Sequence, residues 1–283
     1  MVAGACSTKT TTGAEPAPCA DPVKRINQAI EALDWDDVQV AFDVIDKDGF
    51  RVCSATEAAW DSYVESEDQA MKSSAFEFRD DSIYLIEISG GLHATIAMGI
   101  DDAMLEATGP EATGTDHRVF RAFRDAYVNT TLEPAASKLP KLSPDCCYGP
   151  ARDIGAIKPP RVHWNEFHTF KVEVGVFQGW RSMNAKVVQY RVFPGLRYVL
   201  CVFVSPDMSV REYKLFSITN NELEGEAPAR VNPIPITAAT RIVLDGRRLL
   251  ALPDELALPG RFPAEVSLDL HPILEDALLY DED

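Results

Sequence analysis

The sequence predicts an α/β (α+β) fold, in which helices flank a central sheet of mixed strand direction. Apolar and polar residues alternate between Phe167 and Val176, which is typical of a strand. Between Arg181 and Phe193 the apolar residues recur at helical spacing. Tyr198 to Val204 is a continuous apolar run, which indicates a strand buried on both faces of a sheet.

The N-terminal part of the chain predicts a tail followed by helices. Residues 1–20 are rich in Ser, Thr, Ala and Pro and lack the apolar segment of a signal peptide, so we expect a disordered tail. Asp21 and Pro22 suit the N-cap and the first position of a helix. Ser54 and Glu57 have the spacing of a capping box for a helix that reaches about Met71. We therefore expect residues 21–75 to form a helical N-terminal extension.

The predicted core covers residues 76–220 and opens with a strand and a helix. Residues 82–88 are rich in β-branched and aromatic side chains and precede two glycines, which predicts a strand. Residues 93–105 carry apolar side chains at helical spacing, although Gly99 lies inside this segment. Residues 119–128 fit a helix and a strand equally well.

Further elements complete the core. Residues 144–148 predict a short strand, and residues 210–216 predict a strand that returns from a turn at residues 205–208. If the strands before and after the helix at residues 181–193 are parallel, their crossover is right-handed. We expect residues 221–283 to form a C-terminal extension, with a hairpin around Asp245-Gly246 and an acidic tail.

The charge of the chain is strongly acidic but unevenly distributed. The formal net charge is −17 and the sequence pI is about 4.7, which argues against broad, non-specific binding to nucleic acid or to anionic membranes. The stretch from Arg161 to Lys214 contains 8 basic and 4 acidic residues, so its charge is +4 and the remainder carries −21. This basic stretch predicts either a surface that holds phosphate-bearing DNA or a solvated face of lysines and arginines.

The cysteines and the hydropathy pattern bear on the compartment. The 6 cysteines include no CxxC pair and no cluster with zinc spacing, so we expect free thiols in a reducing, intracellular compartment, either cytoplasm or nucleus. There is no apolar run of about 18 residues, and we therefore expect no membrane partner.

Two acidic residues in the core predict a metal site. Asp145 opens one predicted strand and Glu173 lies within the next. If these strands are neighbours, the two carboxylates can converge on one hard divalent cation. Such a cation activates water and neutralises the charge of a phosphodiester.

A set of short motifs between Ser143 and Leu215 resembles the restriction-endonuclease branch of the PD-(D/E)XK nuclease superfamily. The motifs are Pro144-Asp145, Val172-Glu173-Val174, Lys186, Tyr190, Pro194-Gly195, Tyr198-Val199-Leu200 and Tyr213-Lys214-Leu215. A weaker resemblance extends back to the strand at Ser82 and the helix at His93. The resemblance implies a restriction-endonuclease-like sheet, Mg²⁺ or Mn²⁺ as cofactor, and Asp145 and Glu173 as metal ligands. It also implies hydrolysis of phosphodiester bonds in DNA.

The chain departs from this pattern at Gly175, where the superfamily has a lysine two residues after the acid. Three residues are candidates to replace that lysine in catalysis. Lys171 shares a strand face with Glu173, Gln178 follows the strand, and Lys186 lies on the next helix, from which a long side chain can reach back. We favour Lys186 slightly. The alternative is that Lys171 and Lys186 are surface charges and Gln178 is a loop or capping residue.

Two functions remain open at this point. The first is a metal-dependent DNA endonuclease, and the second is a catalytically degenerate nuclease fold that acts as a protein-interaction module. The paired acids and the local basic stretch favour the first function, whereas Gly175 and the net charge favour the second. As a further partner we expect a second copy of the chain, in a homodimer.

Overall fold

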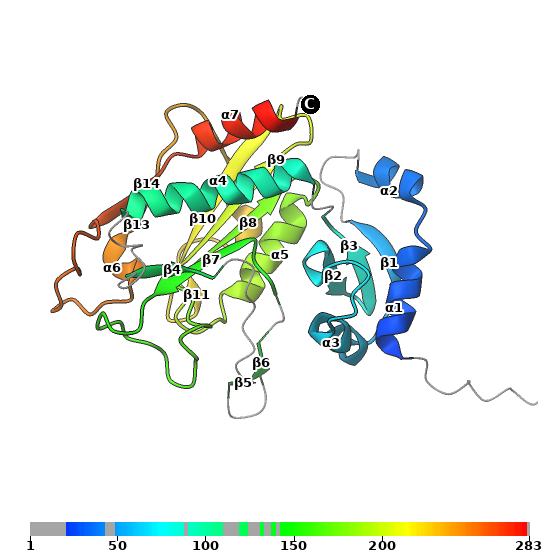
Figure 1. Ribbon diagram of the computed structural model, residues 1–283, viewed down its shortest axis with the longest axis horizontal. Coiled ribbons are helices and arrows are strands. Elements are labelled where there is room, and N and C mark those ends of the chain that lie inside the picture. The colour runs from blue at the N-terminus through cyan, green and yellow to red at the C-terminus, as the bar shows by residue number, and fades with distance from the viewer. Residues whose placement is uncertain are drawn as a thin grey trace, which may run out of the picture.

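The computed structural model describes residues 21–42, 49–87, 90–109, 119–123, 131–132, 137–139 and 142–281. Within these ranges the chain forms a small N-terminal unit and a larger body built on a mixed sheet (Figure 1). The predicted α+β class is confirmed. The predicted tail at residues 1–20 and the last two acidic residues lie outside the described ranges.

The N-terminal unit combines helices with a small sheet of its own. Its three antiparallel strands pair in the order β1-β3-β2. Its hydrophobic core includes Ile26, Tyr63, Phe76, Ile83 and Leu85. The elements are α1 (Pro22–Glu31), α2 (Trp35–Phe42), β1 (Phe50–Ser54), α3 (Glu57–Glu65), β2 (Phe76–Arg79) and β3 (Ser82–Leu85). The strands β2 and β3, which the sequence placed in the core at residues 76–220, therefore pack with the N-terminal extension.

The start of α1 is confirmed, whereas the predicted start of α3 is wrong. The Asp21 side chain accepts a hydrogen bond from the Val23 backbone N–H at 3.0 Å and caps α1. In α3 the capping side chain belongs to Thr56, and the helix ends at Glu65, before Met71. Ser54 is the last residue of β1 and pairs with Ser82, so the strand holds it away from the helix terminus.

The larger body is built on a seven-stranded mixed sheet, as counted over the described residues. Its order is β11-β10-β9-β8-β7-β4, with β12 added beside β10. The strands β8 and β9 are parallel and are joined through α5, whereas all other neighbouring pairs are antiparallel. The strands are β4 (Phe120–Ala122), β7 (Cys146–Pro150), β8 (Phe170–Gly175), β9 (Tyr198–Val204), β10 (Arg211–Thr219), β11 (Glu222–Leu223) and β12 (Ile234–Pro235).

Helices cover both faces of this sheet (Figure 1). On one face, α4 (Gly91–Thr108) packs beside α7 (Leu270–Asp281), over Val172, Val174, Leu200 and Val202. On the other face, α5 (Trp180–Tyr190) covers Val199, Cys201 and Phe203. Alternate residues of one strand therefore enter two different cores, which is why β9 is apolar throughout.

Gly99 lies inside α4 because of this helix packing. A Cβ atom at this position would lie 2.6 Å from Cγ2 of Ile273 on α7. Real Cβ atoms essentially never approach another atom so closely. The glycine that weakens the sequence prediction of a helix is thus where two helices approach each other.

The C-terminal part is integral to the larger body. The expected hairpin at Asp245-Gly246 is wrong, because Asp245 ends β13 (Ile242–Asp245) and caps α6 (Gly246–Leu249). Its Oδ1 accepts a hydrogen bond from the Arg248 backbone N–H at 2.9 Å. The true partner of β13 is β14 (Glu265–Leu268), which lies further along the chain. Residues of both strands enter the same core as α4.

Several smaller features complete the description. Two short strands, β5 (Thr131–Leu132) and β6 (Ser137–Lys138), form a separate pair. Within residues 119–128, Phe120 to Ala122 is a strand, and residues 124–128 lie outside the described ranges.

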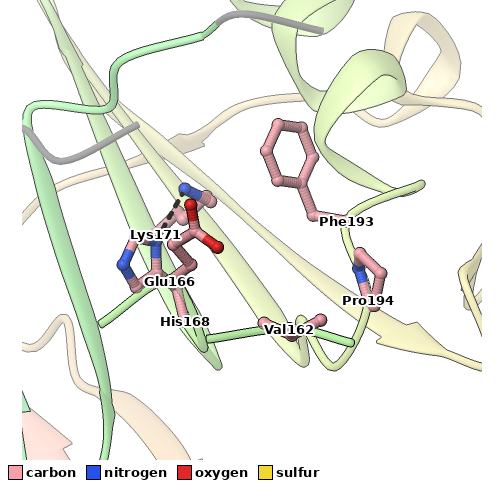
Figure 2. Close-up of a pocket in the computed structure, with 6 residues that line it drawn as sticks. All are labelled: Val162, Glu166, His168, Lys171, Phe193 and Pro194. Atoms are coloured by element: carbon pink, nitrogen blue, oxygen red, sulfur yellow. Dashed lines mark hydrogen bonds between the residues drawn. The ribbon is translucent and has the colours of Figure 1, made fainter. Parts of the chain in front are cut away.

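Cys53, Cys146, Cys147 and Cys201 are free thiols. In the described segments no helix is long and apolar enough to span a membrane. A narrow pocket is lined by Val162, Glu166, His168, Lys171, Phe193 and Pro194 (Figure 2).

Candidate active site

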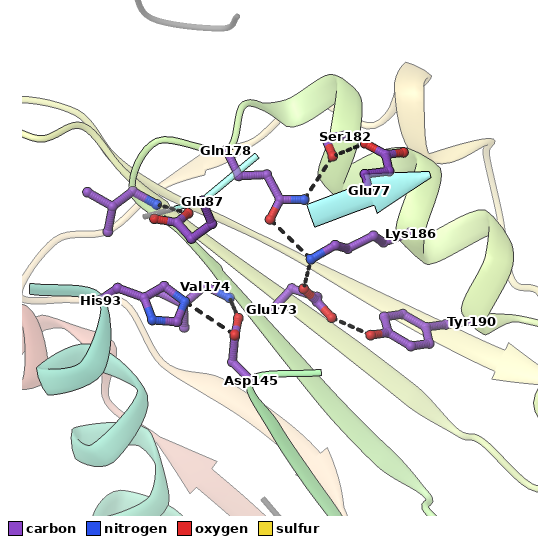
Figure 3. Close-up of polar contacts among 11 residues, drawn as sticks. Glu77, Glu87, His93, Asp145, Glu173, Val174, Gln178, Ser182, Lys186 and Tyr190 are labelled. Atoms are coloured by element: carbon purple, nitrogen blue, oxygen red, sulfur yellow. Dashed lines mark hydrogen bonds and ion pairs between the residues drawn. The ribbon is translucent and has the colours of Figure 1, made fainter. Parts of the chain in front are cut away.

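The two predicted metal ligands come from neighbouring segments, since Asp145 directly precedes β7 and Glu173 lies within β8. In the antiparallel pair β7–β8, Cys146 is opposite Val172, and the Asp145 backbone N–H donates to the Val172 carbonyl at 3.1 Å. Figure 3 shows the Asp145 and Glu173 side chains near each other. The pairing of β7 with β8 therefore brings the two carboxyl groups into the same region of the larger body.

Asp145 is held by the backbone of β8 and by a histidine of α4. Its Oδ2 accepts a hydrogen bond from the Val174 backbone N–H at 2.6 Å. Its Oδ1 lies 3.2 Å from Nε2 of His93, which is ion-pair distance without the geometry of a good hydrogen bond. Burial raises the pKa of Asp145, but His93, Lys186 and the Val174 N–H together outweigh burial and lower it. In return, Asp145 and Glu87 outweigh the effect of burial on His93 and raise its pKa to about 9.

Glu173 is completely buried and both of its oxygens accept hydrogen bonds. The Lys186 ammonium on α5 donates to Oε2 at 2.7 Å, and the Tyr190 hydroxyl donates to Oε1. Burial lowers the pKa of Lys186, but the attraction of Glu173 and Asp145 is stronger and raises it above its ordinary value. Lys186 is therefore a buried cation whose charge depends on these two acids.

Gln178 also belongs to this group. Its Oε1 accepts a hydrogen bond from the Lys186 ammonium at 3.2 Å, and its Nε2 donates to the Ser182 hydroxyl at 2.9 Å. A Cβ atom at Gly175 would lie 2.6 Å from the Gln178 carbonyl and 2.9 Å from Sδ of Met183. The close approach of this turn to β8 accounts for a glycine where the superfamily pattern has a lysine.

The third candidate, Lys171, lies toward the other end of β8. Its Nζ is 3.2 Å from Nδ1 of His168. The same atom is 5.1 Å from the ring centre of Tyr190 and 5.0 Å from that of Phe193. Its side chain forms part of the narrow pocket shown in Figure 2. Burial lowers the pKa of Lys171, and Cys147 and Glu173 offset this only in part. The structure thus brings Lys186 and Gln178 to Glu173, and pairs Lys171 with a histidine.

The alternative interpretation of Lys171 and Lys186 as surface charges is wrong, whereas Gln178 does lie in the loop between β8 and α5. Lys171, Lys186 and Gln178 are all buried, and so is Lys214. Three of the eight basic residues between Arg161 and Lys214 therefore contribute no exposed charge. Arg161 and Arg181 are exposed on the surface of this stretch.

Sequence reasoning missed Glu87, which lies beside this group. Its Oε2 accepts a hydrogen bond from the Val176 backbone N–H at 3.2 Å, and its buried Oε1 has no partner within the described part of the chain. Burial raises the pKa of Glu87 to about 7, and His93 lowers it only in part. An acid inside the apolar run at residues 83–88 was the available signal, because a buried acid in such a run requires an explanation.

Asp145 and Glu173 supply the carboxyl oxygens that a hard divalent cation prefers, and both oxygens of Glu173 accept hydrogen bonds in this structure. Within the residues described, no group of three or more His, Cys, Asp or Glu side chains is placed to hold a metal ion. Mg²⁺ does not require such a cage, because it commonly binds through one or two carboxylates together with water and substrate phosphates. The unpartnered Oε1 of Glu87 adds a further carboxyl oxygen nearby. Asp145 and Glu173 are the residues that would hold the metal.

His168 leads to a prediction about pH. Burial and the neighbouring Lys171 lower the pKa of His168 to about 3, whereas an unfolded chain has a histidine pKa near 6.5. Between these pH values His168 binds a proton in the unfolded chain but not in the folded protein. The stabilisation of the folded protein that results from this difference is therefore complete above about pH 6.5 and is lost as the pH falls toward 3. We expect this loss to amount to roughly 3–5 kcal/mol of unfolding free energy.

The measurement is urea unfolding of the wild type and of His168→Asn at a series of pH values from about 7 down to about 4. The variant is expected to lose less stability per pH unit than the wild type. The exposed His163, replaced in the same way, serves as the control and should leave the slope unchanged. Equal slopes for the wild type and His168→Asn would contradict the prediction.

Comparison with known proteins adds no family to these observations. The chain matches no model of a known protein family and no curated protein sequence.

Proposed function

We propose that this protein is a metal-dependent endonuclease that hydrolyses phosphodiester bonds in DNA, with Mg²⁺ or Mn²⁺ as the cofactor. One observation carries the proposal. Asp145, which directly precedes β7, and Glu173 of the neighbouring strand β8 lie near each other (Figure 3), and the Lys186 ammonium contacts Glu173 at 2.7 Å. Two acids and a lysine are the residue types on which the resemblance to the PD-(D/E)XK superfamily rests.

The roles of the residues follow from their charges. When bound, the divalent cation supplies activation of water and neutralisation of phosphate charge. Asp145 keeps its negative charge because His93 lowers its pKa, so it is ready to bind a cation. Lys186 keeps its positive charge and is placed to stabilise negative charge that develops on a phosphate oxygen. A fixed ammonium in a buried site is more effective in this role than one in water.

The proposal extends to substrate approach and to the compartment. The net charge of −17 works against non-specific DNA binding, so contact with DNA depends on local cations. Arg161 and Arg181 are exposed in the basic stretch and would supply this contact. The four free thiols among the described residues support an intracellular location, in the cytoplasm or the nucleus, because thiols stay reduced there. A homodimer would bring two such centres to the two strands of DNA.

A second function is favoured by the state of Glu173. Both of its oxygens accept hydrogen bonds, and the side chain has no exposed surface. In a catalytically degenerate nuclease fold, the Lys186 ammonium would replace the metal as the cation that stabilises the acids. Such a protein would act as a protein-interaction module.

Metal binding separates the two functions. We expect calorimetric titration with Mn²⁺ to show binding by the wild type, and binding at least about tenfold weaker by Asp145→Asn. The introduced asparagine still offers a side-chain oxygen to the Val174 N–H, so the fold should survive. Asp102→Asn, an exposed position on α4, is the matched control and should bind as the wild type does.

A nicking assay on supercoiled plasmid completes this test. Activity in the wild type that requires Mn²⁺ and is lost in Asp145→Asn supports the nuclease. Absence of binding heat and of nicking in the wild type would reject it in favour of the interaction module. Activity that is unaffected by Asp145→Asn would show that the catalytic centre lies elsewhere.

A further inference from the structure

A continuous chain of hydrogen bonds connects the N-terminal unit with Lys186 (Figure 3). Glu77 on β2 is only 8 % exposed, and its Oε2 accepts a hydrogen bond from the Ser182 hydroxyl at 2.8 Å. Ser182 lies on α5 and accepts in turn from Nε2 of Gln178 at 2.9 Å. Oε1 of Gln178 accepts from the Lys186 ammonium at 3.2 Å. The Lys186 ammonium also donates to Oε2 of Glu173 at 2.7 Å.

The direction of each hydrogen bond in this chain is determined by its two ends. A lysine ammonium can only donate, and an ionised carboxylate can only accept. Between them, the Ser182 hydroxyl must donate to Glu77 and accept from Gln178. The Gln178 amide must then present its N–H₂ group to Ser182 and its oxygen to Lys186. The opposite orientation of the amide would direct its N–H₂ group at the ammonium.

Glu77 is itself held in place within the N-terminal unit. The Arg79 guanidinium contacts Oε2 of Glu77 at 2.7 Å and lies 4.0 Å above the ring centre of Tyr84. Arg79 therefore gives the buried carboxylate a cationic partner, which reduces the cost of its burial. A carboxylate with a fixed position is a suitable anchor for a hydrogen-bond chain.

The N-terminal unit also contacts the site next to Gln178. Phe177 packs against the hydrophobic cores of both the N-terminal unit and the larger body. Its ring lies edge-on to Phe42 of α2, with a centre-to-centre distance of 5.5 Å. The apolar contact at Phe177 and the polar contact at Glu77 therefore fix the turn after β8 from the same side.

We propose that Glu77 is a positioning residue of the active site, through which the N-terminal unit orients Lys186. Glu77 sets the direction of the Ser182 hydroxyl, the hydroxyl sets the Gln178 amide, and the amide oxygen holds the Lys186 ammonium beside Glu173. The expected effect of Glu77 on catalysis rests on the proposed function. Its effect on the orientation of the Gln178 amide and the Lys186 ammonium does not. The N-terminal unit is on this view a part of the catalytic machinery.

The first test is independent of metal and of catalysis. The side-chain amide signals of Gln178 can be assigned in a ¹H–¹⁵N NMR spectrum by their loss in Gln178→Ala. We expect these signals to shift in Glu77→Ala and in Ser182→Ala, because both substitutions remove a link of the chain. Glu67→Ala, an exposed acid of the same unit, is the control and should leave them in place. Unshifted signals in both Glu77→Ala and Ser182→Ala would overturn the proposal.

The second test uses the nicking reaction at saturating metal. We expect kcat to fall about tenfold in Glu77→Ala and Ser182→Ala with KM little changed, as for other residues that orient a ligand through a hydrogen bond. Glu77→Gln retains an oxygen that accepts from Ser182 and should recover most of the loss. A Glu77→Gln variant as slow as Glu77→Ala would reject the hydrogen-bond role.

These readouts separate the two proposals. A wild type without nicking activity rejects the nuclease, and the amide signals of Gln178 then decide the hydrogen-bond chain alone. If Glu77→Ala does not fold, Ser182→Ala carries the same test, because it removes a single link of the chain. Normal nicking in a folded Ser182→Ala would overturn the positioning role even where the wild type is active.

Discussion

Replacing Lys186 with Met is expected to lower the free energy of unfolding by about 3–5 kcal/mol, because it leaves the buried Glu173 carboxylate without its cation. Glu173 has no exposed surface, and Lys186 is its ion-pair partner at 2.7 Å. The isosteric Glu173→Gln should cost a similar amount, since it leaves a buried ammonium beside a neutral amide. Urea unfolding measures both values.

The double variant Glu173→Gln/Lys186→Met provides the control for this prediction. Removing both charges leaves no unpaired ion, so its loss should be smaller than the sum of the single losses by at least about 2 kcal/mol. Lys171→Met is a second comparison. Lys171 is equally buried but makes no ion pair with any described residue, so its removal should be nearly neutral or stabilising. Additive losses in the double variant would show that the two charges are not coupled.

The largest expected effect on activity is at the same lysine. If the protein is the proposed nuclease, Lys186→Arg should lower kcat for plasmid nicking by about 100-fold. Arginine keeps a positive charge for Glu173, but it presents a planar fork in place of a compact ammonium. Lys171→Met should stay within about threefold of the wild type, because its Nζ contacts His168.

The measurement is steady-state nicking of supercoiled plasmid at saturating Mn²⁺, with melting curves recorded for each variant. The result distinguishes among the candidates that replace the lysine expected at Gly175. A loss of about 100-fold in Lys171→Met with normal nicking in Lys186→Arg would reverse the assignment and move the reacting group toward the pocket at His168.

The sequence by itself determined the order and type of the central elements. The apolar run of β9 has the bounds Tyr198–Val204 that its composition predicts, because a strand covered on both faces must be apolar throughout. The alternation in β8 likewise separates Val172 and Val174, which enter the core beneath α4, from Glu173, which contacts Lys186 of α5. Placing Asp145 beside the strand that carries Glu173 required only that consecutive strands pair, which they commonly do.

The tertiary structure decided which side chains meet. Lys171 and Lys186 are indistinguishable by residue type, and only the packing of α5 on the sheet brings Lys186 to Glu173. The assignment of β2 and β3 to the N-terminal unit, and of Asp245 to a helix cap, likewise depends on partners distant in the chain. Glu77, Glu87 and His93 reach the site from segments far from residue 173. Local spacing specifies the face on which a side chain lies, whereas strand register and helix packing specify what it contacts.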